Sequence, residues 1–128
     1  MKTITIFILL SYSCLACAAD FAARVAEAKT AAATPDGKEY ETSTYPAIQA
    51  AMLTSIPPGT TNPENLGKFT LVTYVTKSGM LSAVEVQPNT KVSQCFSELF
   101  AKCQLPTLPS ALTNELGYPL EVTMSIAP

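Results

Sequence analysis

Two adjacent β-rich segments joined by a short turn are the feature that most constrains how this chain can fold. Lys68–Thr76 and Met80–Gln87 are dense in β-branched and aromatic residues and alternate along their length, as strands do. Lys77–Gly79 between them ends in a glycine that can adopt a positive φ. The pattern predicts a β-hairpin. On the first strand Phe69, Leu71, Thr73 and Val75 should project to one face, and on the second strand Ser82, Val84 and Val86 should share a face.

An amphipathic helix and a final strand are expected after the hairpin. Thr90 can cap a helix that runs from Lys91 to about Gln104. Its apolar stripe has helical spacing and consists of Val92, Cys95, Phe96, Leu99, Phe100 and Cys103. Leu120–Ile126 alternates throughout, which predicts a strand with Leu120, Val122, Met124 and Ile126 inward and Glu121, Thr123 and Ser125 outward.

A further helix is expected upstream of the hairpin. Thr34 followed by Pro35 is a typical helix start. Pro46 predicts a kink or a break, and Pro57–Gly59 must end the helix. The residues expected to share its broad apolar face are Tyr40, Tyr45, Ile48, Met52 and Ile56.

This order of elements predicts an α+β fold. A three-stranded antiparallel sheet of chain order β-β-α-β, with two or three helices packed on one face, would bury all the apolar stripes together. A chain of 128 residues is short for two cores, so we expect one α+β domain over residues 35–128. Residues 20–34 are Ala-rich and are expected to form an N-terminal helix or a tether.

Residues 1–19 have the three-part pattern of a secretory signal peptide. Lys2 provides the positive start, Ile4–Leu10 the apolar centre, and Ser11–Ala19 a region of small residues suited to cleavage. The apolar run is too short for a membrane anchor, which needs roughly 20 residues, and no later segment of the mature chain could span a bilayer. We therefore expect a periplasmic protein; a lipoprotein acylated at Cys17 is the less favoured alternative.

Two cysteines, Cys95 and Cys103, remain after the leader is removed. If both lie on one helix, their Cα atoms are about 12 Å apart, which is too far for a disulfide. They are expected to be two buried apolar side chains. The alternative is a free thiol available for an intermolecular bond, because an exported protein meets an oxidising environment.

The composition argues against an enzyme. The chain has no histidine, which removes the commonest general base and metal ligand, and two thiols do not make a zinc site. No glycine-rich phosphate loop is present, so no catalytic, cofactor or metal site is expected. Without Lys2 the chain has seven basic and ten acidic residues, a net charge of −3, which argues against nucleic-acid binding.

The segment from Gly67 to Ile126 resembles the C-terminal periplasmic domain of the TonB and TolA envelope proteins. The shared pattern is a hairpin, an amphipathic helix, Leu105–Pro106 after the helix, and a closing strand. TolA is the closer of the two because it also has a preceding helix, here Tyr45–Ser55. The membrane anchor and long spacer of those transducers are not expected here. TolA-like domains also join a cysteine on the first strand to one on the helix; Cys95 fits the second position, but Phe69 stands near the first.

The resemblance implies a non-enzymatic module that binds another envelope protein or a peptide segment along an exposed sheet edge. The closing strand is the expected edge, with Glu121, Thr123 and Ser125 as its outward residues and Glu121 as a guard against indiscriminate pairing. A monomer or weak dimer is expected. The alternative function is a small periplasmic inhibitor or immunity-type protein that binds an enzyme through loops such as Pro57–Asn65.

Overall fold

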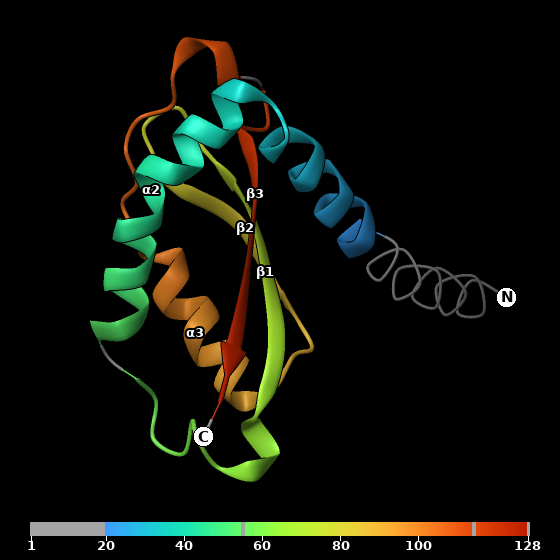
Figure 1. Ribbon diagram of the computed structural model, residues 1–128, viewed down its shortest axis with the longest axis vertical. Helices are drawn as coiled ribbons and strands as arrows, with labels where there is room; N and C mark the ends of the chain where they lie inside the picture. Colours follow the sequence, from blue (N-terminus) through green and yellow to red (C-terminus); the bar gives the residue numbers. More distant parts are fainter. Residues whose placement is uncertain (1–19, 55, 114, 128) are drawn as a thin grey trace, which may run out of the picture.

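The computed structural model describes residues 20–54, 56–113 and 115–127 (Figure 1). The expected leader, with Cys17, lies outside them. Residues 20–32 are helical, and the elements that follow are α2 (Pro35–Thr54), the 3-10 turn η1 (Pro63–Asn65), β1 (Gly67–Val75), β2 (Leu81–Gln87), α3 (Lys91–Ala101), the 3-10 turn η2 (Ser110–Leu112) and β3 (Tyr118–Ile126).

The three strands form one antiparallel sheet in the order β2-β1-β3, which confirms the predicted α+β fold. The hairpin β1–β2 is present, and the chain crosses back through α3 to place β3 on the other side of β1. Helices α2 and α3 cover one face of the sheet, whereas the helix over residues 20–32 lies on the opposite side (Figure 1). The sheet is therefore the middle layer.

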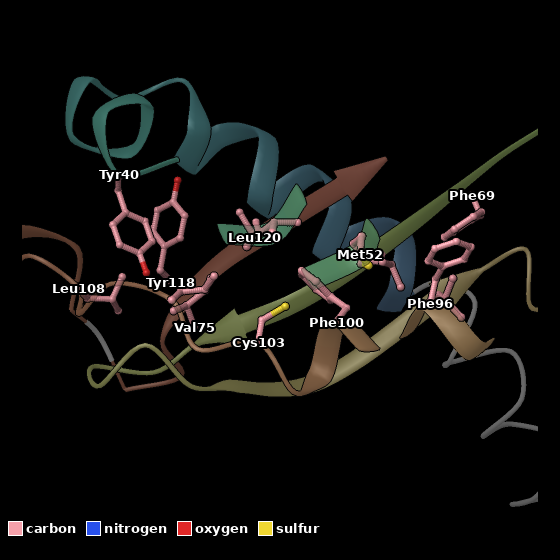
Figure 2. Close-up of a cluster of buried hydrophobic side chains, with 14 of the residues drawn as sticks. Tyr40, Met52, Phe69, Val75, Phe96, Phe100, Cys103, Leu108, Tyr118 and Leu120 are labelled. Carbon is pink, nitrogen blue, oxygen red and sulfur yellow. The ribbon is translucent and has the colours of Figure 1, made fainter. Parts of the chain in front are cut away.

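The main core lies between the sheet and the two helices α2 and α3. Phe100, Leu71 and Val75 have no exposed surface. At one end of the core the rings of Tyr40 and Tyr118 meet edge to face, with centroids 5.5 Å apart (Figure 2). Phe69 and Phe96 contact at the other end, with centroids 5.6 Å apart.

The hairpin contains a bulge that the alternation pattern does not predict. The register slips between Val72 and Tyr74 of β1, and Ala83 of β2 has a φ of 52°. The extra residue reverses the alternation of β2 at this point. Leu81 therefore packs toward the core together with Val84 and Val86, and Ser82, expected to share a face with these two valines, is exposed instead.

Helix α2 begins where the sequence predicts and continues through Pro46. The Gly37 N–H donates to Thr34 Oγ1 at 3.0 Å, which caps the helix. Pro46 does not break the helix, and Figure 1 shows the bend near its middle that an internal proline causes. The buried stripe is Tyr40, Thr44, Ile48 and Met52, spaced by four residues, so Tyr45 and Ile56, expected in the core, are exposed.

Helix α3 has a capping box, in which Thr90 and Ser93 exchange side-chain to backbone hydrogen bonds. It ends at Ala101, three residues before the predicted end. The chain becomes extended there because its backbone bonds to the hairpin turn instead: the Leu105 N–H donates to Gly79 O at 3.0 Å. Cys103 therefore lies beyond the helix.

The N-terminal helix packs against the second face of the sheet. Phe21 and Ala28 are buried on it, and so is Val72 of β1, which lies outside the main core. Arg24 is 7% exposed; its guanidinium lies 4.7 Å from the centre of the Tyr74 ring. Strand β1 is therefore covered by α2 and α3 on one face and by the N-terminal helix on the other.

Candidate partner-binding edge

Strand β3 is an edge of the sheet, and among the described residues its only neighbour is β1. Nine consecutive residue pairs join the two strands, from Gly67↔Ile126 to Val75↔Tyr118, without a register shift. The other edge, β2, is interrupted by the bulge at Ala83. A bulge twists an edge away from further pairing, so β3 is the edge whose backbone is regular enough to receive another strand.

The hydrogen bonds of β1 identify the β3 residues whose backbone faces outward. The Thr76 N–H donates to Met80 O at 2.8 Å, so even-numbered residues of β1 bond toward β2 and odd-numbered ones toward β3. Their bonded partners on β3 are the even-numbered residues. Pro119 fits this alternation, because a proline in a sheet occupies a position whose N–H would face outward. Glu121, Thr123 and Ser125 therefore direct their N–H and C=O groups away from the sheet.

The side chains of β3 follow the predicted alternation. Leu120 is buried, and Val122, Met124 and Ile126 pack partly against the core. Thr123 and Ser125 are exposed on the other face, and Glu121 is half-buried there. Thr123 Oγ1 lies 3.2 Å from Thr70 Oγ1 on β1 and donates to Glu121 Oε1 at 3.4 Å.

An apolar groove of about 220 Å³ borders this edge on the side of α2. Its helix wall includes Tyr45 and Leu53, which are 56% and 64% exposed. The lining residues are Tyr45, Ile48, Gln49, Met52, Leu53, Val122, Thr123, Met124 and Ser125. Sequence reasoning placed Tyr45 in the core and did not select Gln49 or Leu53. Tyr45, Gln49 and Leu53 are spaced by four residues and so lie in a row beside the buried stripe of α2. This spacing is the signal that could have identified the helix wall of the groove.

The carboxyl of Glu41, which is half-buried on α2, lies beside the start of β3. The Tyr118 hydroxyl donates to Glu41 Oε2 on α2. Burial raises the pKa of the Glu41 carboxyl, the Tyr118 hydrogen bond opposes that rise, and the charge of Glu121 adds to it. The hydrogen bond connects α2 to the first residue of β3. Burial, together with the neighbouring Glu41, also raises the pKa of Tyr118.

Both thiols were expected to be buried apolar side chains, and this expectation is confirmed for Cys103 but wrong for Cys95, which is only half-buried. Both are free. Cys103 is buried, which raises its thiol pKa and opposes formation of the thiolate. Cys95 is half-buried and lines a hollow of about 530 Å³ beside the Pro57–Asn65 loop. Neither thiol lies at the β3 edge.

Within residues 20–54, 56–113 and 115–127, no group of three or more acidic or cysteine side chains is arranged to hold a metal ion. No helix in that part of the chain is both long and apolar enough to cross a membrane. Compared with protein-family models, curated proteins and solved structures, the chain has no significant match.

Proposed function

We propose that this protein is a non-enzymatic periplasmic binding module that receives an extended segment of another envelope protein along β3, in the manner of the TolA and TonB C-terminal domains. The signal-peptide pattern of residues 1–19 supports export. The observation that carries the binding proposal is the coincidence of a regular free edge with an apolar groove along the same strand.

An added strand would use both features of this site. Main-chain hydrogen bonds to Glu121, Thr123 and Ser125 would provide affinity that does not depend on the partner's side chains. Alternate side chains of the partner would point to the groove side of the sheet. There they would contact Tyr45 and Leu53, whose apolar surface is exposed in this chain and would be covered by the partner. The groove would therefore select apolar residues at every second position.

The Pro57–Asn65 loop is the basis of a second candidate, an inhibitor or immunity-type protein. The loop is held by its own hydrogen bonds: Asn65 Nδ2 donates to Gly59 O at 2.7 Å, and Thr60 Oγ1 donates to Pro57 O. It forms one wall of the hollow of about 530 Å³ that reaches Lys91 and Cys95 on α3. A rigid loop of this kind could insert into an enzyme's cleft.

Capture of partners from an envelope extract by matched variants separates the two candidates. Thr123→Pro removes one outward N–H but leaves the β1–β3 hydrogen bonds in place, and Thr123→Val changes the side chain while keeping the N–H. We expect the wild type and Thr123→Val to capture a partner and Thr123→Pro to lose it. A loop double variant, Asn62→Ala with Glu64→Ala, should capture as the wild type does.

The reverse pattern would overturn the proposal. If Thr123→Pro, shown to be folded by its circular dichroism and its amide spectrum, captures the partner while the loop variant does not, the loop is the binding site. Fractionation of cells that make the full chain tests the location, and recovery in the cytosol with the leader uncleaved would contradict export.

A further inference from the structure

Two carboxylates flank Val72 in the same row across the sheet, and among the described residues only one of them is paired with a cation. Val72 is paired with Glu85 on β2 and with Glu121 on β3. Arg24 Nη1 lies 3.2 Å from Glu85 Oε1. Glu121, on the free edge, has one oxygen, Oε2, that is buried and makes no hydrogen bond within the described part of the chain.

The charges around Glu121 do not compensate for this. Its Oε1 accepts a hydrogen bond from Thr123, which is neutral. The charge of Glu41 on α2 is of the same sign, and Glu121 contributes to the raised pKa of the Glu41 carboxyl. Arg24 lies beside Glu85 and the Tyr74 ring; its Nη2 is also buried and makes no hydrogen bond to Glu121 or to any other group in the described residues. A buried carboxylate oxygen without a donor is unfavourable, so this position is suited to a cation supplied from outside.

We propose that the segment received by β3 carries a lysine or arginine directly opposite Glu121, with aliphatic residues on either side of it. This inference rests on the proposed function, since it requires a strand beside β3. In such a strand the residue opposite Glu121 projects on the same face as Glu121 and meets it as a cross-strand pair. Its two neighbours in the strand are opposite Leu120 and Val122 and project to the groove side.

The partner is therefore defined by a short pattern rather than by a name. The partner segment has apolar residues opposite Met124 and Val122, a polar residue opposite Thr123, and a basic residue opposite Glu121. The main chain binds at the outward amides, the apolar positions fill the groove beside Tyr45 and Leu53, and the cation fixes the register. A one-residue slip would direct the cation into the apolar groove, which is unfavourable.

Fluorescent ten-residue peptides test this proposal directly. The probes alternate valine and threonine and differ at one central position, which is lysine, norleucine or glutamate. We expect the lysine peptide to bind the exported protein up to about fivefold more tightly than the norleucine peptide, the upper end for a favourable cross-strand charge pair, and the glutamate peptide to bind most weakly. Glu121→Gln should abolish the preference, and Glu121→Lys should reverse it toward glutamate.

Glu98→Gln is the matched control, because it removes the same charge from the exposed side of α3, away from the edge. The Glu98→Gln variant should keep the preference for the lysine peptide. If Glu121→Gln also keeps that preference, Glu121 is not the residue that recognises the cation. Equal affinities for all three peptides, with shifts of the β3 amide signals, would reject the cation but retain the docking edge. Amide signals that shift only in other elements, or in no element, would reject both. Signals of β3 that change with protein concentration alone would assign the edge to a second copy.

Discussion

Arg24 on the N-terminal helix and Glu85 on β2 are joined by an ion pair of 3.2 Å across the second face of the sheet. The same guanidinium covers the ring of Tyr74. The helix, β1 and β2 are thereby connected through one side chain. The ion pair lies on the β2 side of Val72, and within the described residues the carboxylate on the β3 side, Glu121, has no such cation.

Arg24→Ala should destabilise the fold by about 1–3 kcal/mol, because it removes a cation–π contact, an ion pair and the packing of a buried stem. Glu85 is 46% exposed, so Glu85→Ala should cost less than about 1 kcal/mol. Urea unfolding of the two variants measures both free energies. Equal and small effects would show that Arg24 does not hold the N-terminal helix to the sheet.

Ala83→Gly should stabilise the protein by up to about 1 kcal/mol, because alanine is strained at positive φ and glycine is not. Ala83 has a φ of 52° in the bulge of β2. Ala83→Val should be destabilising, since a β-branched residue tolerates this conformation least. The two thermal midpoints, compared with that of the wild type, check the bulge, and a destabilised Ala83→Gly variant would contradict it.

Glu41→Gln should change how stability depends on pH. The folded-state pKa of Glu41 is raised, so the protonated carboxyl is favoured by folding and this contribution is lost as the pH rises through the folded-state pKa. The glutamine variant lacks that loss and can still accept the Tyr118 hydrogen bond. Its stability relative to the wild type should therefore increase from acidic toward neutral pH. A constant difference would contradict the raised pKa.

Glu121→Gln tests the electrostatic interaction between Glu41 and Glu121. The charge of Glu121 contributes to the raised pKa of Glu41, so its removal should lower the pKa of the Glu41 carboxyl, as followed by carbon-13 NMR titration. Glu98→Gln, a variant with the same change in net charge, should leave the titration where it is. An unchanged midpoint in Glu121→Gln would mean that the two carboxylates do not interact.

The two thiols should react with a bulky alkylating reagent at very different rates. Cys95 is half-buried at the border of a surface hollow, whereas Cys103 is 6% exposed. We expect modification of Cys95 in the native protein and of Cys103 only under denaturing conditions. Mass spectrometry of the alkylated protein distinguishes the two sites. Rapid native labelling of Cys103 would contradict the packing around it.

Much of the fold could be predicted because the apolar periodicity and the turn signals agree. Leu120–Ile126 alternates without interruption and is a strand with the predicted inward face. The stripe that includes Phe96 and Phe100 belongs to a helix that Thr90 caps as expected. In these segments local preference and burial favour the same structure, so sequence reasoning succeeds.

The features that were not predicted depend on contacts between distant segments. The bulge at Ala83 reverses the pattern of β2, and nothing in the local sequence marks it. Helix α3 ends at Ala101 because the next residues bond to the hairpin turn. The burial of Arg24 depends on Tyr74 and Glu85, about 50 and 60 residues further along the chain. The groove wall at Tyr45 and Leu53 likewise exists only because α2 lies beside β3.

Hydrogen exchange of the β3 amides, measured with and without the captured partner segment, tests the central claim most directly. In the free protein the amides of Leu120, Val122 and Met124 should be protected by β1, whereas those of Glu121, Thr123 and Ser125 should exchange rapidly. Binding should slow exchange at the second set and leave the Pro57–Asn65 loop unchanged. Protection that appears only in the loop, with Glu121, Thr123 and Ser125 still exchanging rapidly, would contradict docking at the sheet edge.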